Sequence, residues 1–285
     1  MKSEVKRGYL LEDFRLFRLK TAMSGEIEPH YHDFHKVLLF EGGDAGYIIE
    51  GRKFNLTPGD IVLVSAGDVH CPVVAVGKPY ERTVIYISPQ FLKHFSGITD
   101  NTDNLQHCFD IAKNKGSVLH INGRVRPFLL SPLETVISET DNYNNNKNAF
   151  AGRLMAKAAF IQFVIALNRA IIYHDLREER AKTDPKIEKL IAHINANLQD
   201  ADLTADALAT NAFLSRWHLM RKFKAVTGYS LHRYITEKRL LKARQLLTDS
   251  DAPITEVCYM CGFNDYSTFA RAFKKLFNRS PKNMR

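Results

Sequence analysis

The sequence predicts an α+β protein in which an N-terminal antiparallel β-domain and a set of helices precede an all-α domain. Short runs rich in β-branched and aromatic residues, separated by turn formers, fill residues 14–90. From Ser88 onward the apolar residues recur with helical spacing. Residues 203–230 and 253–280 then repeat one pattern of helix, tight turn and helix. At 285 residues the chain is long enough for two domains with their own cores.

The strands predicted in the first segment are short, and the turns between them are regular. Strands are expected over 36–40, 45–49, 61–64 and 83–87. Turns rich in glycine and aspartate separate them, as in the Thr-Pro-Gly-Asp sequence of 57–60. This spacing is typical of an antiparallel sandwich or barrel.

Helices and a linker are expected between the strands and the repeat. Helical periodicity runs from Ser88 through 101–113 and 126–141, and the polar tract 142–148 predicts a loop. A long amphipathic helix is predicted over 149–173. Its apolar stripe consists of Leu154, Ala158, Ile161, Ile165, Leu167 and Ile172. The charged stretch 177–185 ends in a proline and is the predicted linker.

The two copies of the repeat align when the sequence is shifted by fifty positions. Phe213 then coincides with Phe263, and Arg221 coincides with Arg271. Ser215 coincides with Asp265, and both residue types cap helix N-termini. Each copy is therefore predicted to contain a short helix, a turn and a second helix that begins after the capping residue.

The second helix of each copy has an apolar side and a basic, aromatic side. We expect Leu219, Phe223 and Val226 to face the core in the first copy. Phe269, Phe273 and Leu276 should do so in the second. The outward positions, which we expect to contact DNA, are Ser215, Arg216, Trp217, Met220, Arg221, Lys224, Tyr266, Ser267, Thr268, Arg271 and Lys275.

Double-stranded DNA is the partner that these outward positions predict. Arginine bridges O6 and N7 of guanine, and Trp and Met contact thymine methyl groups or sugars. A basic face that is only solvated is the alternative, and its repetition in two copies argues against it. Residues 230–247 are predicted to form one stiff helix between the copies. That helix would let the second helices of the two copies enter successive major grooves about 34 Å apart.

The charge of the chain is concentrated in the repeat-bearing part. Residues 182–285 hold 18 Lys and Arg against 10 Asp and Glu, which gives +8 of the total +9. Such a surplus attracts a phosphate backbone. The longest apolar stretch, 158–167, is far short of a membrane span, and the N-terminus has no secretory pattern. We therefore expect a cytoplasmic, nucleoid-associated protein with no membrane partner.

Residues 187–285 resemble the DNA-binding domain of the AraC/XylS family of bacterial transcription regulators. The resemblance rests on LSRWHLMRKFKAVTGYSLHRYI and PITEVCYMCGFNDYSTFARAFKKLFNRSP. It implies DNA contacts by Trp217, Met220, Arg221, Thr268 and Arg271, with RNA polymerase as a further partner. The family often has a polar residue where this chain has Met220.

Residues 14–90 resemble the cupin-like β-barrel that precedes many such DNA-binding domains. The resemblance rests on PHYHDFH, on the Gly46 to Gly51 segment and on LTPGD followed by Val69-His70. It implies an effector-binding barrel over 1–95 and a helical dimerisation and linker segment over 96–180. The DNA-binding domain would then span 181–285, with helix-turn-helix units at 203–228 and 253–277. A homodimer and a small-molecule effector follow from the same resemblance.

The histidines of the barrel segment are its candidate effector or metal ligands. His30 and His32 share one face of a strand, and His70 follows later, as in metal-binding cupins. The carboxylate of the cupin metal set is absent, because Lys36 or Val37 occupies its position. His35 lies at an odd offset from His30 and should point away. A divalent metal, an organic effector lined by these histidines and Lys36, and a purely structural role remain open.

Three functions are consistent with this sequence. The first is a regulator, without catalytic activity, whose DNA binding responds to a small-molecule effector. The second is a metal-binding cupin, either a sensor or a metalloenzyme, fused to a DNA-binding domain. The third is an architectural DNA binder without an effector. No cofactor is predicted, apart from the divalent metal considered above.

Overall fold

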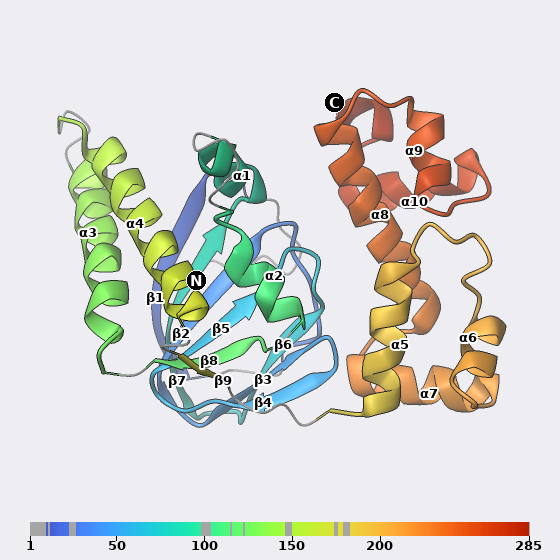
Figure 1. Ribbon diagram of the computed structural model, residues 1–285, viewed down its shortest axis with the longest axis horizontal. Helices are drawn as coiled ribbons and strands as arrows, with labels where there is room; N and C mark the ends of the chain where they lie inside the picture. The colour runs from blue at the N-terminus through green and yellow to red at the C-terminus, as the bar shows by residue number, and fades with distance from the viewer. Residues whose placement is uncertain are drawn as a thin grey trace. The chain divides into compact units, whose positions relative to one another are not determined.

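The computed structural model describes residues 10, 12–22, 27–97, 104–114, 116–121, 123–145, 150–173, 176–178 and 183–284. Two compact units emerge from the contacts along the chain. The first comprises residues 1–49 and 53–182, and the second comprises residues 50–52 and 183–285. Figure 1 shows the strands together with α1–α4 in the first unit, and α5–α10 in the second.

The first unit contains two antiparallel sheets. The strands are β1 Phe14–Ala22, β2 His35–Gly43, β3 Ala45–Ile49, β4 Arg52–Asn55, β5 Asp60–Val64, β6 His70–Val74, β7 Pro79–Ile87, β8 Val118–Ile121 and β9 Leu176–Glu178. One sheet has the order β1-β7-β2-β5-β8-β9, and the other has the order β4-β3-β6. All four predicted strands are present, and the antiparallel arrangement is confirmed.

The predicted barrel is not closed, since the described strands pair as two separate sheets. The chain passes from one sheet to the other between β2 and β3, next to Gly43. This residue has a φ of 114°, and a Cβ there would lie 2.1 Å from the carbonyl oxygen of Pro79. Only glycine fits such a corner. The sharp change of direction therefore separates β3 from the ladder of β2, and the sheets face one another as layers.

Strands β2 and β5 are buried on both faces. Val37 and Leu39 contribute to a core that includes the helices of this unit, whereas Leu38 and Phe40 contribute to a second core with β3. Alternate residues of a strand point to opposite faces. The uninterrupted apolar runs in the sequence therefore reflect a strand covered on both sides, rather than one that faces water.

Four helices belong to the first unit: α1 Pro89–Gly97, α2 His107–Asn114, α3 Arg126–Asn145 and α4 Gly152–Ile172. In Figure 1, α3 and α4 lie side by side as an antiparallel pair. The predicted loop over 142–148 is wrong for 142–145, because α3 continues through Asn145, and 146–148 lie outside the described residues. An asparagine-rich sequence does not by itself end a helix, because Asn adopts helical geometry at a modest cost.

The apolar stripe predicted for the long helix lies largely on the outside of α4. Leu154, Ile165 and Ile172 are exposed, whereas Phe160 and Phe163 are fully buried in the core. Within the described chain, α4 is long and apolar enough to span a membrane by length and composition, and half of its most apolar window is buried. That burial is typical of a core helix. The helix is thus apolar on two sides, which hid its core face from the periodicity.

The second unit contains α5 Pro185–Ala196, α6 Ala205–Asn211, α7 Arg216–Thr227, α8 Leu231–Asp249, α9 Ile254–Met260, α10 Tyr266–Phe277 and a short 3-10 helix, Pro281–Met284. The predicted caps Ser215 and Asp265 accept hydrogen bonds from the backbone of the helices that follow them, and Thr204 does the same for α6. The linker prediction is wrong at 177–178, which pair as part of β9 with β8, and at Pro185, which begins α5. Residues 179–182 lie outside the described part of the chain.

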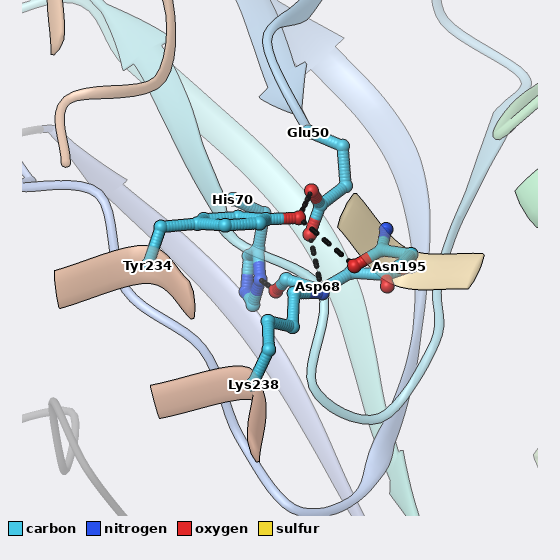
Figure 2. A network of polar contacts seen from close by, with 6 residues as sticks. All are labelled: Glu50, Asp68, His70, Asn195, Tyr234 and Lys238. Carbon is cyan, nitrogen blue, oxygen red and sulfur yellow. Dashed lines mark hydrogen bonds and ion pairs between the residues drawn. The ribbon is translucent and has the colours of Figure 1, made fainter. Parts of the chain in front are cut away.

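Residues 50–52 join the second unit through Glu50. Its carboxylate accepts a hydrogen bond from Lys238 Nζ at 2.8 Å and another from the Tyr234 hydroxyl (Figure 2). Tyr234 also lies 3.4 Å from Oδ1 of Asn195. Glu50 and Tyr234 are both buried. A buried carboxylate needs such partners, because an uncompensated charge away from water is costly.

The buried side chain of Asn168 ties α4 to the start of α2. Its Oδ1 accepts from the Cys108 N–H at 2.8 Å, and its Nδ2 donates to the carbonyl groups of Leu105 and Val164. We expect Asn168→Leu to lower the free energy of unfolding by about 1–3 kcal/mol, because it leaves buried backbone groups without partners. Urea unfolding measures this change. Gln162→Leu, at an exposed position of the same helix, should stay within about 0.5 kcal/mol of the parent, and equal effects would contradict the assignment.

Candidate functional site

The first helix-turn-helix consists of α6, a turn and α7. The Ser215 hydroxyl accepts from the His218 N–H at 3.3 Å and so fixes where α7 begins. Leu219 and Phe223 are fully buried, as predicted, and they orient the helix. Val226 is only partly buried, and Thr227 is buried beside it. Arg216, Trp217, Met220, Arg221 and Lys224 are left exposed on the other side.

The second helix-turn-helix, formed by α9 and α10, repeats this construction. The Asp265 carboxylate accepts from the Thr268 N–H, and hydrogen bonding to Thr268 lowers the pKa of Asp265 below its usual value. Phe269 and Phe273 are fully buried. The exposed positions are Tyr266, Ser267, Thr268, Arg271 and Lys275. All eleven outward residues predicted from the sequence are thus exposed on α7, α10 or at their caps, and we call α7 and α10 the recognition helices.

The two matching arginines of the recognition helices are held in different ways. The Arg221 guanidinium lies over the Trp217 ring, 4.4 Å from its centroid. Arg271 instead donates from Nε to the carbonyl oxygen of Ser267 at 3.3 Å. Both partners are four residues earlier in the helix, on the same face. The arginines therefore occupy equivalent positions but have different orienting contacts.

Helix α8 joins the two motifs without a break. It runs from Leu231 to Asp249, with the Ser230 hydroxyl as its N-terminal cap. Nineteen residues of α-helix extend about 28 Å at 1.5 Å per residue. The predicted stiff connection is present, and its length is of the same order as the rise of one DNA turn.

The turns of the two motifs differ, although Phe213 and Phe263 are aligned in the sequence. Phe213 has a φ of +53° and is 91% exposed, whereas Phe263 is 8% exposed and packs in the core. In the second motif the positive φ falls one residue earlier, on Gly262. Ala212 occupies that place in the first, and a positive φ is costly for alanine. The presence of Ala212 where the second motif has Gly262 was therefore the signal in the sequence that the two turns differ.

In the first unit, His30, His32 and His70 form a cluster, which we call the histidine cluster. His30 and His70 pair through two backbone hydrogen bonds of 3.0 and 2.8 Å, so their side chains lie together. Their ring centroids are 4.5 Å apart, and that of His32 lies 5.0 and 5.1 Å from the other two. One ligand atom of each residue lies within 4.8 Å of the others.

Backbone carbonyl groups orient two of these imidazoles. His30 Nδ1 is 2.8 Å from the Glu28 oxygen, and His70 Nδ1 is 2.9 Å from the Asp68 oxygen (Figure 2). A carbonyl only accepts, so each Nδ1 carries a proton and donates. In the neutral ring, the lone pair is then on Nε2.

The environment keeps the buried members of the cluster uncharged. Burial, with the nearby charges of Lys36 and His30, lowers the pKa of His32 to about 2. Burial and Lys36 also hold the pKa of His70 well below its usual value. Both imidazoles are therefore neutral at physiological pH.

His35 lies apart from the cluster, as its odd offset predicted. Its ring stacks on Phe109 with centroids 4.1 Å apart, and its Nδ1 accepts from the Ala66 N–H at 3.1 Å. Lys36 is 5% exposed, and its ammonium lies 5.7 Å from the Tyr47 ring centroid and 6.0 Å from that of Tyr86. Lys36 is thus close enough to act on the cluster electrostatically, whereas His35 belongs to the packing between β2 and α2.

Comparisons with known proteins match both units. A model described as an AraC-like ligand binding domain matches residues 20–130, and one described as a helix-turn-helix domain matches residues 208–285. The HTH-type transcriptional activator RhaS of Shigella sonnei is 26% identical over 267 residues, which cover 91% of this chain and 88% of the relative.

Solved structures give weaker likenesses. An AraC-type transcriptional regulator from Chromobacterium violaceum is 32% identical over 35% of this chain and 89% of its own, with a TM-score of 0.33. ToxT from Vibrio cholerae covers 95% of this chain and 97% of its own, with 16% identity and a TM-score of 0.37. Because these TM-scores are below 0.5, the family of the chain is assigned from the sequence matches alone.

The matched regions define a transcription regulator that joins a ligand-binding domain to a helix-turn-helix DNA-binding domain, and its DNA binding is modulated by an effector. The exposed basic faces of α7 and α10 belong to the second of these domains. The chain is a member of the AraC family. The relatives it matches are regulators rather than enzymes.

His35 gives the first unit a pH-dependent stability. Burial lowers its folded pKa from 6.5 to about 3, so the unfolded chain takes up a proton that the folded chain does not. The stabilisation is complete above pH 6.5 and declines as the pH falls below it, by about 1 kcal/mol between pH 7.5 and 5.5. His35→Gln, which keeps an acceptor for the Ala66 N–H, should reduce proton uptake on unfolding by about one. Urea titrations at the two pH values measure this, and identical pH dependence in both proteins would contradict it.

Proposed function

We propose that this protein is a cytoplasmic, nucleoid-associated homodimeric activator whose two recognition helices read an operator in adjacent major grooves. The observation that carries this proposal is the pair of capped helices with buried apolar sides and exposed basic sides. The relative RhaS is a transcriptional activator, which favours activation and a contact with RNA polymerase. The effector binds in the N-terminal domain, in the region lined by the histidine cluster and Lys36.

In this proposal the exposed basic residues divide between contacts to base edges and contacts to phosphates. Arg221 and Arg271 contact base edges, because their guanidinium groups project from the exposed face and bond two acceptors at once. Lys224 and Lys275 are exposed about one helical turn after these arginines, and in this proposal they bind phosphates of the DNA backbone. Arg216 forms an exposed ion pair with Asp206 at 3.1 Å, which contributes little to stability and can exchange for a phosphate.

Helix α4 supplies the surface for the homodimer. Its outward side carries Leu154, 67% exposed, together with Ile165 and Ile172. These residues are spaced by eleven and seven positions, so they lie along one line of the helix. An apolar line of this kind on a folded unit favours burial against an equivalent helix of a second copy.

We expect Arg221→Ala to weaken operator binding by about 1–3 kcal/mol and to relax base preference at one operator position. Arg221→Lys is the matched control, because it keeps the charge and loses the planar fork. It should retain affinity for random DNA while losing most of the discrimination. Fluorescence anisotropy with the operator and its single-base variants measures both. Equal weakening on all sequences by Arg221→Ala, with Arg221→Lys close to the parent on every sequence, would make Arg221 a phosphate contact instead.

For the dimer surface, we expect the double variant Leu154→Glu and Ile165→Glu to be monomeric while the fold is retained, since both side chains are exposed. Sedimentation velocity gives the mass, and circular dichroism gives the fold. Lys189→Glu, on the exposed side of α5, introduces a carboxylate away from this surface and should leave the mass unchanged. A double variant that remains dimeric would place the interface elsewhere.

A further inference from the structure

The histidine cluster has the properties of a metal site. Neither matched family model describes a metal site. We propose that His30, His32 and His70 bind a divalent transition-metal ion. The inference is independent of DNA reading, because all three residues belong to the first unit. It rests on the convergence of their ligand atoms within 4.8 Å and on what surrounds each ring.

The backbone positions the cluster before any ion arrives. The hydrogen-bonded pair between His30 and His70 joins the segment before β2 to the first residue of β6. His32 is two residues beyond His30, and its carbonyl accepts from the Gly67 N–H at 2.7 Å. These backbone contacts fix the main chain at all three histidines, and the ring of His32 stacks on Phe34 with centroids 4.4 Å apart, so binding an ion requires little reorganisation.

The carbonyl contacts direct ligand nitrogens toward the common point. Because Nδ1 of His30 and Nδ1 of His70 donate to Glu28 and Asp68, Nε2 is the ligand atom in both rings. An imidazole that binds a metal usually donates its other N–H to a carbonyl or carboxylate, which sets the tautomer and raises ligand basicity. The outer contacts of a metal site are therefore present.

Two ring nitrogens in the cluster are buried without a partner. These are Nδ1 of His32 and Nε2 of His70, in side chains that are 5% and 1% exposed. Buried polar groups are rarely left in this state, because each loses its hydrogen bonds to water. A metal ion would satisfy Nε2 of His70. A purely structural role leaves it orphaned, which disfavours that alternative.

The ligand set selects the class of ion. Three imidazole nitrogens suit zinc, nickel or copper, whereas magnesium and calcium prefer oxygen ligands, and the described cluster contains no carboxylate. Three protein ligands leave a fourth position for water or an anion. The buried Lys36 ammonium adds positive charge nearby, so it weakens cation binding and favours an anionic fourth ligand.

The test uses the full-length chain, stripped of metal by a chelator and titrated with zinc sulfate in a calorimeter. We expect one equivalent of zinc per chain. His70→Gln and His32→Gln should each bind zinc more weakly by on the order of 100-fold, at least the loss caused by removing an outer contact. Replacing zinc with cobalt should give the visible absorption of a tetrahedral site, and His70→Gln should lose it.

Two control variants separate a specific site from general histidine binding. His35→Gln removes a buried histidine outside the cluster and should bind zinc like the parent. Lys36→Met removes the nearby charge and should bind zinc roughly tenfold more tightly. Urea unfolding midpoints establish that each variant is folded. The proposal is overturned if the parent binds no zinc, if both cluster variants bind like the parent, or if His35→Gln is as weak as they are.

Discussion

The first unit depends on strands that are covered on both faces. Val37 and Leu39 of β2 enter the core shared with the helices, and Leu38 and Phe40 enter the core shared with the smaller sheet. Because both faces of β2 are apolar, neither α1–α4 nor the layer of β3 and β6 can be absent without exposing one of them to water. This double burial makes the unit layered, and it also fixes where the polar residues at the start of β2 must lie.

His35 and Lys36 are fixed in this way. Register pairs Lys36 with Val64 on one side and with Tyr86 on the other, so the lysine cannot leave the sheet without breaking two ladders. Its ammonium is consequently held beside Tyr47 and Tyr86, where its charge adds to the effect of burial in lowering the pKa of His32 and His70. The fold thus places a positive charge next to imidazoles that are neutral at physiological pH.

Local signals in the sequence predicted much of the structure. The strands followed from β-branched runs between turns, and the caps at Ser215 and Asp265 followed from residue type and spacing, because both depend on neighbours in the chain. Sheet closure, the outer side of α4 and the contacts of Glu50 depend on residues far apart in sequence. Periodicity located α4 but not its core face, because the helix carries apolar residues both on its exposed side, such as Leu154, and on its buried side, such as Phe163. The His30 and His32 pair was visible, whereas the partner carbonyl groups that set their tautomers were not.

The two helix-turn-helix motifs share the same capping and buried positions but differ in the contacts of their exposed arginines. Matching caps and matching buried residues, such as Phe223 and Phe273, place Arg221 and Arg271 at the same point of each motif. The residue four positions earlier then decides how each guanidinium is held. In α7 this residue is Trp217, whose ring lies against the Arg221 guanidinium without accepting a hydrogen bond in the plane of its N–H groups. In α10 the corresponding residue is Ser267, whose carbonyl engages Nε and leaves the terminal nitrogens for other acceptors. Because the orienting contacts differ, we infer that the two recognition helices favour different bases, so that an operator fitting both would be asymmetric within each half-site.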